Sequence, residues 1–420
     1  MATVAIVALE HDMTSRRVFL KSGAMAMLSL GFAPSFLGRA AAAVTARRKL
    51  VIAIFQRGAV DGLNMIVPHG ESEYYRLRPT IAIPQPGRGS MGSAIDLDGF
   101  FGLHPSMAPL KPLWDNHSLA IVHACGSPDN TRSHFDAQDY MESATPGVKS
   151  TRDGWLNRCL QISSDERNPL RGVALARTMP RSLEGAAPSL AIGSVDEFGV
   201  RGHTGALFQD QYESSSDRLL SAAGNDAFAA MRTLRQAAGV PYRPAPGVVY
   251  PPTPFGNALQ EIARLAKADV GLEIAFTELG NWDHHVNEGA VTGQIAARLD
   301  EFSRGLAALA ADLGDRLADT IIVTMSEFGR AISENGNGGT DHGHGNAMMV
   351  IGGHVRGGVH GKWPGLADAH RFEGRDLAVT TDFRDVFSEI VVGHLGASRG
   401  ALSRVFPGYT PLSAPGVISA

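Results

Sequence analysis

Residues 49–55, KLVIAIF, form a continuous apolar run that contains Val and Ile. A strand that is apolar on both faces is typical of a parallel sheet covered by helices on both sides. Similar runs recur at residues 119–123, 173–176, 271–277, 319–325 and 347–351. The sequence therefore predicts a mainly parallel sheet that contains these segments.

Helical patterns lie between these runs, most clearly between residues 295 and 313, where apolar residues recur at spacings of three and four. This spacing places the apolar side chains on one face of a helix, which can pack against the sheet. Strands that alternate with helices indicate an α/β fold. We expect one domain over residues 44–420, in which helices flank the central sheet.

Two stretches interrupt this pattern. Residues 177–250 are rich in Ser, Gly and Ala, and we interpret them as an insertion or cap over the sheet. Residues 241–254 contain several prolines, which cannot donate hydrogen bonds to a sheet, and therefore predict an extended connector.

The first 43 residues have the pattern of a twin-arginine signal peptide. Arg16 and Arg17 precede an apolar stretch, and four alanines end at Ala43, where we expect cleavage. The alternatives are a helix of the mature protein or a membrane anchor, although glycines and a proline interrupt a span that is short for a bilayer. No other stretch is long enough to cross a membrane. The sequence predicts export by the twin-arginine translocase to the periplasm or outside the cell.

Composition argues against several functions. The net charge is −4 and no basic stripe is evident, so nucleic acid is not an expected partner. Cys125 and Cys159, the two cysteines, form either a bridge or two buried thiols. The chain has no CxxC, no CxxCH and no GxGxxG after a strand, so an oxidoreductase using haem, an iron–sulfur cluster or a dinucleotide is a weak alternative.

Polar residues gather in the loops at strand ends, where parallel sheets place their ligand sites. These loops span residues 56–64, 126–136, 281–287, 326–330 and 339–346. Their mixture of carboxylates and imidazoles suits zinc, manganese or a similar divalent metal. Three of these loops also have simpler explanations: Asp61-Gly62 is a common turn, His284 and His285 could be one exposed and one hydrogen-bonded imidazole, and residues 341–344 could be a Gly-rich surface loop.

An anion site is also predicted at the start of the helix after residue 133. Thr131 or Ser133 could act as a metal-activated nucleophile, with Arg132 holding an anion, although Ser133 could instead be only a helix cap. Arg57 and Arg330 could clamp an anionic substrate or form ordinary ion pairs.

Several of these motifs together resemble the domain-of-unknown-function family 1501, over about residues 50–395. The motifs are RGAVDGLN (57–64), YRLRP (75–79), TRSHF (131–135), WD (282–283), SEFGR (326–330) and DHG (341–343). Members commonly carry a twin-arginine leader and are grouped with the alkaline phosphatase and sulfatase superfamily. The resemblance therefore implies an alkaline phosphatase-like α/β fold.

The resemblance also implies a set of site residues. The nucleophile is Ser133 or Thr131, and the metal ligands are Asp61, Asp283, His285, Glu327, and His342 or His344. Two ions would fit the superfamily template, but Phe328 replaces one of its imidazoles, and the spacing after Asp283 differs from the usual one. One ion therefore remains an alternative to two.

The leading hypothesis is an exported, metal-dependent hydrolase that acts on small anionic phosphate or sulfate esters. The alternative is a non-catalytic secreted binding or assembly protein on a degenerate form of the same fold.

Overall fold

The computed structural model describes residues 47–87, 92–163, 168–195, 232–233 and 242–419. Residues 49–420 form the compact unit that contains every element named below. The predicted leader, residues 1–43, lies outside the described residues, as does much of the predicted insertion at 177–250. None of the described helices is long and apolar enough to span a membrane.

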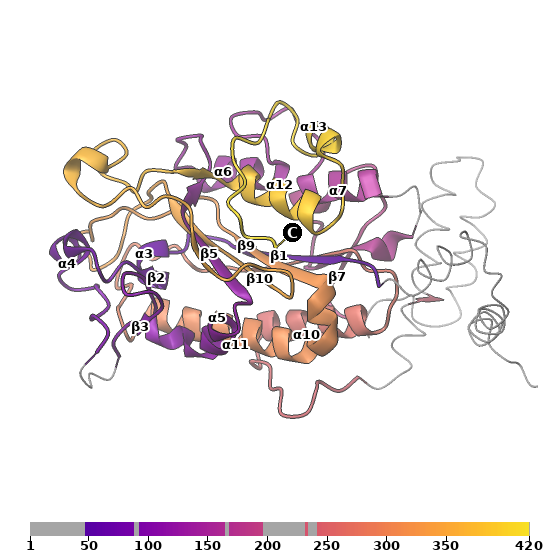
Figure 1. The fold of residues 1–420 in the computed structure, drawn as a ribbon, viewed down its shortest axis with the longest axis horizontal. Coiled ribbons are helices and arrows are strands. Elements are labelled where there is room, and N and C mark those ends of the chain that lie inside the picture. Colours follow the sequence, from indigo (N-terminus) through magenta and orange to yellow (C-terminus); the bar gives the residue numbers. More distant parts are fainter. Residues whose placement is uncertain (1–46, 88–91, 164–167, 196–231, 234–241, 420) are drawn as a thin grey trace, which may run out of the picture. The chain divides into compact units, whose positions relative to one another are not determined.

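A mainly parallel sheet forms the centre of this unit (Figure 1). Its strands follow the order β11-β5-β10-β9-β1-β8-β6-β7, and β12 also pairs with β5. Among its described strands, β10 alone runs antiparallel to its neighbours. The strands are β1 Leu50–Gln56, β5 Leu119–Gly126, β6 Gly172–Leu175, β7 Leu190–Ile192, β8 Ile274–Leu279, β9 Thr320–Met325, β10 Asn346–Gly352, β11 Gly358–His360 and β12 Thr381–Asp382. The predicted α/β class is confirmed.

Helices cover both faces of the sheet (Figure 1). On one face lie α5 Lys111–Asp115, α10 Pro254–Lys267 and α11 Gln294–Leu313; on the other lie α6 His134–Ser143, α7 Trp155–Ser163, α12 Phe383–Gly393 and α13 Leu402–Val405. Two short helices, α3 Gly62–Met65 and α4 Ser72–Leu77, and a small sheet of β2 Ile66–Val67, β3 Ile95–Asp96 and β4 Gly102–Leu103 complete the named elements.

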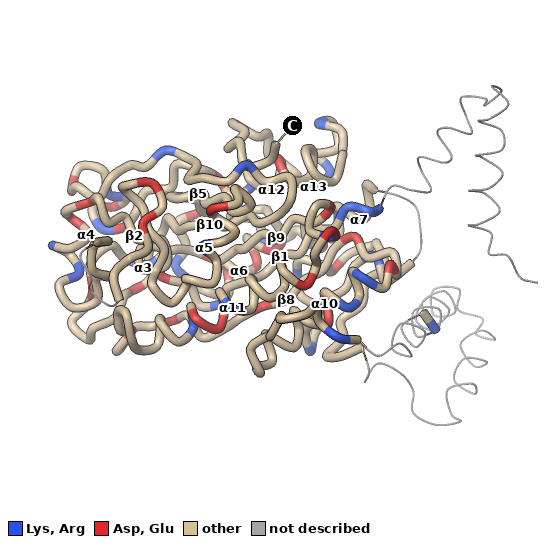
Figure 2. Tube along the Cα trace, turned by 60° about the horizontal axis from the view of Figure 1, so that its bottom comes forward, with Lys and Arg blue, Asp and Glu red and all other residues tan. Residues whose placement is uncertain are grey.

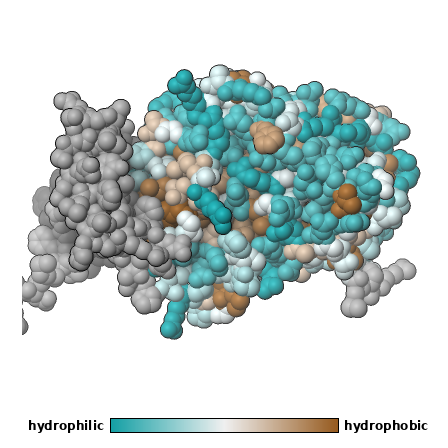
Figure 3. Space-filling model, turned by 180° about the vertical axis from the view of Figure 1, so that it is seen from behind, coloured by the Kyte–Doolittle hydropathy of each residue, from teal (hydrophilic) through white to brown (hydrophobic). Residues whose placement is uncertain are grey.

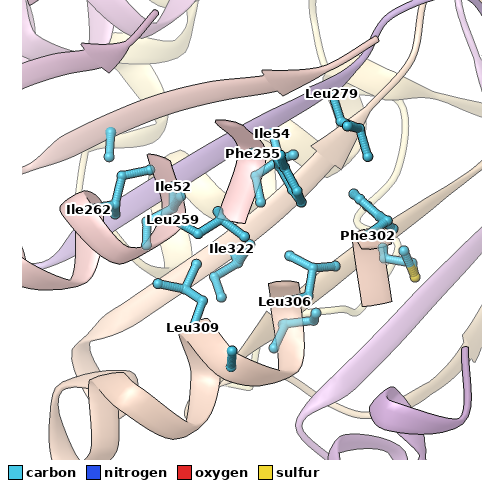
Figure 4. Close-up of a cluster of buried hydrophobic side chains, with 14 of the residues drawn as sticks. Ile52, Ile54, Phe255, Leu259, Ile262, Leu279, Phe302, Leu306, Leu309 and Ile322 are labelled. Atoms are coloured by element: carbon cyan, nitrogen blue, oxygen red, sulfur yellow. The ribbon is translucent and has the colours of Figure 1, made fainter. Parts of the chain in front are cut away.

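Strand β1 lies between two hydrophobic cores because its side chains alternate between the faces of the sheet. Ile52 and Ile54 pack in the core formed with α10 and α11, as Figure 4 shows. Val51 and Phe55 enter the opposite core, with residues of α7, α12 and α13. This arrangement explains the continuous apolar run in the sequence.

Each apolar run predicted as a strand coincides with a strand of the central sheet, and α11 covers the predicted helical pattern. The proline-rich connector, described from residue 242 onward, is fixed to α11, because the hydroxyls of Tyr242 and Tyr250 and the backbone N–H of Ala245 all donate to Asp312. Cys125 and Cys159 are free and buried, so the second of the two explanations for them is correct.

The directions of the strands bring the polar loops to one edge of the sheet. Strands β5, β9, β1 and β8 share one direction and end there, while the antiparallel β10 begins there. The loops after β5, β8 and β9 and the loop before β10 therefore meet at this edge.

Charged residues are interleaved along the described chain (Figure 2), and one face of it shows only small apolar groups (Figure 3). Figure 2 shows Lys and Arg interleaved with Asp and Glu along the trace. In Figure 3 the visible face is hydrophilic over most of its area, and its hydrophobic residues form small groups.

Candidate metal centre

Four side chains converge at this edge of the sheet. One ligand atom each from His134, Asp283 and His342 lies within 4.8 Å of the others. The Nε2 atom of His342 lies 2.9 Å from Nε2 of His134 and 2.9 Å from Nε2 of His285. The Oδ1 atom of Asp283 lies 3.0 Å from Nε2 of His285 and 3.3 Å from Nε2 of His342. The cluster therefore contains three imidazoles and one carboxylate.

The four members come from three segments of the chain. His134 is the first residue of α6, which follows β5, and Asp283 and His285 lie in the loop after β8. His342 lies shortly before β10 and forms an isolated bridge with Arg330 in the loop after β9. Gly343 permits this contact, because a Cβ there would lie 2.3 Å from the backbone of Arg330.

The second nitrogen of each imidazole faces a hydrogen-bond acceptor. Nδ1 of His134 lies 2.8 Å from Oε1 of Glu327, and Nδ1 of His285 lies 3.1 Å from Oδ1 of Asp341. Nδ1 of His342 lies 2.8 Å from the carbonyl oxygen of Arg132. These acceptors place the ring proton on Nδ1 and leave Nε2 as a lone-pair donor.

This donor set fits a divalent metal ion. With the ring protons on Nδ1, the Nε2 atom of His342 faces those of His134 and His285 and the Asp283 carboxylate, an arrangement that a cation between them would stabilise. Imidazole and carboxylate ligands suit zinc and several other transition metals. The residues that would hold the ion are His134, Asp283, His285 and His342.

Asp283 is kept ionised by Arg330. Burial alone would raise the pKa of the Asp283 carboxyl, but the guanidinium of Arg330, whose Nη2 donates to Oδ1 at 2.6 Å, outweighs this effect and lowers the pKa. Arg330 also donates to the carbonyl oxygens of Gly58, Ala59, Trp282 and Thr340. It therefore ties the loops after β1, β8 and β9 together and fixes the carboxylate.

The cluster is open to solvent. The side chains of Asp283 and His285 are 42% and 39% exposed, and those of His342 and His134 are 24% and 23% exposed. On the inner side, the ring of Phe328 lies 4.9 Å from the ring of His134 and 5.0 Å from that of His342, centroid to centroid. The ligand atoms thus have an apolar wall behind them and water in front.

Three other residues predicted as ligands lie outside the cluster. Both carboxylate oxygens of the buried Asp61 accept hydrogen bonds from Arg78. Glu327 faces Nδ1 of His134 rather than the ligand atoms. His344 is buried and stacks on Phe372, with ring centroids 4.0 Å apart.

The arginines predicted to bind an anion are each paired within the protein. Arg57 binds Glu142, Glu278 and Gln138, Arg132 binds Glu373 and Asp376, and Arg330 binds Asp283. Ser133 is exposed and occupies the N-cap position of α6 without a capping hydrogen bond from its side chain. The hydroxyl of Thr131 accepts from the backbone N–H of Ser133.

His134 is the member of the cluster that the sequence reasoning did not single out. The only signal for it is its place in the TRSHF motif, one residue after the predicted nucleophile Ser133. The motif predicted a nucleophilic hydroxyl, whereas its imidazole makes the contact with His342.

Comparison with known proteins gives distant structural similarities. The C-terminal periplasmic domain of EcEptC from Escherichia coli, solved in complex with Zn, is 9% identical, with a TM-score of 0.34 and 73% of each chain covered. The lipoteichoic acid synthase LtaP from Listeria monocytogenes is 8% identical, with a TM-score of 0.31, covering 73% of this chain and 66% of that one. The PsFucS1 sulfatase from Pseudoalteromonas sp. is 12% identical, with a TM-score of 0.33, covering 91% and 75%. These similarities are too weak to transfer a function.

The sequence itself gives a clearer result. No protein of curated function matches it. The family described as protein of unknown function (DUF1501) matches residues 48–387, which confirms the predicted resemblance, and the chain belongs to this family.

Proposed function

We propose that the chain is a hydrolase of phosphate or sulfate esters that depends on one divalent metal ion. The observation that carries this proposal is the convergence of His134, Asp283, His285 and His342 at a solvent-exposed edge of the sheet. A parallel sheet commonly places its active site at this edge. The family resemblance to the alkaline phosphatase and sulfatase superfamily supports the choice of ester.

The four residues would hold the ion, and Arg330 would keep Asp283 ionised and in place. When bound, such an ion polarises an ester oxygen and stabilises the negative charge that develops during hydrolysis. One ion rather than two is proposed, because the carboxylates of Asp61 and Glu327 already bind other groups in the protein.

Ser133 is the proposed nucleophile. Its hydroxyl is exposed and lies one residue before His134, at the start of α6. The hydroxyl oxygen would form a bond to phosphorus or sulfur while its proton passes to solvent, and the ester oxygen would leave as the alcohol after taking a proton from water. A water molecule would then release phosphate or sulfate and restore the hydroxyl.

The test combines metal analysis with activity. The full chain is reconstituted with zinc or manganese, and hydrolysis of p-nitrophenyl phosphate and p-nitrophenyl sulfate is measured beside the metal content. We expect one equivalent of metal and an activity that a chelator abolishes. Asp283→Ala should lose both, whereas His354→Ala, at an exposed histidine outside the cluster, should keep both.

Two results would count against the hydrolase. A folded chain that takes up no metal removes the proposed site. A chain that binds one equivalent of metal but hydrolyses neither ester favours the non-catalytic binding or assembly protein.

We also propose export by the twin-arginine translocase to the periplasm or outside the cell. The support is the sequence of the first 43 residues, with the paired Arg16 and Arg17. Changing both arginines to lysine should leave the chain in the cytoplasm in a cell-fractionation experiment. Unchanged export of this variant would exclude the proposed route.

A further inference from the structure

Glu327 is a buried carboxylate that accepts hydrogen bonds from residues around the cluster. Its side chain is 0% exposed. Oε1 accepts from the backbone N–H of Gly58, from Nε2 of Gln138 and from Nδ1 of His134, each at 2.8 Å. Oε2 accepts from the hydroxyl of Ser326 at 3.2 Å. Because these donors surround both oxygens of the carboxylate, they hold it in one orientation.

This orientation places Glu327 behind His134 rather than beside the ion. Glu327 contacts Nδ1 of the ring, whereas Nε2 of the same ring faces His342 and Asp283. A carboxylate on Nδ1 fixes the tautomer that leaves Nε2 free to bind a metal.

The three imidazoles of the cluster have anchors of different strength. The anchor of His134 is a buried carboxylate, that of His285 is the 55% exposed Asp341, and that of His342 is a backbone carbonyl. A hydrogen bond to an ionised group is stronger than one between neutral groups, and water weakens it less at a buried site. His134 is therefore the most firmly oriented ligand.

Phe328, the residue after Glu327, restrains the ring of His134 by packing. Phe328 is 3% exposed, and its ring lies against the rings of His134 and His342. Two consecutive residues after β9 thus hold His134 in place: Glu327 through a hydrogen bond and Phe328 through ring packing.

We propose that Glu327 is not a metal ligand but a positioning residue, which holds His134 as the Nδ1–H tautomer and is the most important anchor of the centre. This inference rests on the proposed metal site, but its test includes a measurement on the metal-free protein.

The first measurement is the affinity of the full chain for zinc, obtained by competition with a chelator, for the wild type, Glu327→Gln and Asp341→Asn. Glu327→Gln keeps the size of the side chain and removes its charge. We expect about a 10- to 100-fold loss of zinc affinity, as is usual for partners of metal-bound histidines. Asp341→Asn, the same change at the exposed anchor, should cost less. Equal affinities for the wild type and Glu327→Gln would overturn the proposal.

The second measurement separates a positioning residue from a ligand. Cobalt(II) replaces zinc, and its visible absorption reports the number and kind of ligands. Glu327→Gln should give the spectrum of the wild type at a higher cobalt concentration. A spectrum that changes in intensity and position, as it should for His342→Ala, would show that Glu327 binds the ion itself.

The third measurement needs no metal. Nitrogen NMR of the histidine rings in the metal-free chain, recorded at a pH at which the rings are neutral, should show His134 as the Nδ1–H tautomer in the wild type and a mixture of tautomers in Glu327→Gln. An unchanged tautomer would contradict the inference whether or not the wild type binds metal. A wild type that binds no zinc would instead contradict the proposed function.

Discussion

Two groups of polar residues follow strands of the same sheet, and they differ in their roles. One is a buried network around Asp61, after β1, in which Arg78 takes both oxygens of the carboxylate and a second carboxyl group, Glu288, accepts from the hydroxyl of Thr340. The other is the exposed cluster of His134, Asp283, His285 and His342.

The difference lies in what neutralises the charge. Burial would raise the pKa of Asp61, but the paired guanidinium of Arg78 outweighs it and lowers the pKa, so the network is a closed ion pair with a structural role. Asp61 also caps α3 by accepting from the backbone N–H of Leu63. In the exposed cluster Arg330 pairs with Asp283, and the Nε2 atom of His342 faces those of His134 and His285. Polar residues after the strands of one sheet therefore build the fold in one place and a candidate site in the other.

The largest effect on stability is expected from Asp61→Asn. It leaves the fully buried Arg78 without its carboxylate, and breaking a buried pair in this way costs about 3–5 kcal/mol. Urea unfolding of the metal-free chain measures this loss. Asp341→Asn, the same change at a 55% exposed site, should cost less than about 1 kcal/mol. Similar losses for both variants would remove the distinction between the two regions.

The next effect is on metal binding. His342→Ala removes the imidazole that contacts both other imidazoles of the cluster, and we expect a loss of zinc affinity greater than the roughly 100-fold limit for supporting partners. His344→Ala, two residues away and outside the cluster, should still bind one equivalent of zinc. Zinc titration of the two variants measures both affinities. If His344→Ala lost zinc binding and His342→Ala kept it, the described site would be contradicted.

The smallest effect is expected from Glu288→Gln in the buried network. Burial and the neighbouring Asp61 raise the pKa of Glu288, so the folded chain holds a proton that the unfolded chain releases above a pH of about 4.3. The wild type should therefore lose stability as the pH rises through this region and up to the folded pKa. The amide of the variant needs no proton, so Glu288→Gln should be more stable than the wild type at neutral pH, by an amount on the order of 1 kcal/mol.

The measurement is urea unfolding of both proteins at pH 4 and pH 7.5. The two should be nearly equal at pH 4, and the difference should appear only at the higher pH. A variant that is less stable than the wild type at pH 7.5 would show that Glu288 is ionised in the fold.

The sequence predicted the scaffold of the site better than the contacts within it. The apolar runs located the strands, and the strand ends located the loops that carry Asp283, His285 and His342, which the structure brings together. The sequence reasoning also proposed Asp61, Glu327 and His344, which lie outside the cluster, and passed over His134. Their roles depend on partners that no spacing in the sequence reveals.

The class of fold and the edge of the sheet where polar side chains gather can therefore be predicted from the residues in order, because hydrophobic periodicity is local and follows directly from the alternation of side chains. Which carboxylate meets an arginine and which meets an imidazole depends on the folded chain. Arg78 reaches Asp61 from a separate helix–loop segment, and Glu327 lies 193 residues from His134 along the chain. Such contacts depend on how distant loops pack together. The sequence therefore does not show whether a side chain contacts Nδ1 or Nε2 of a histidine ring.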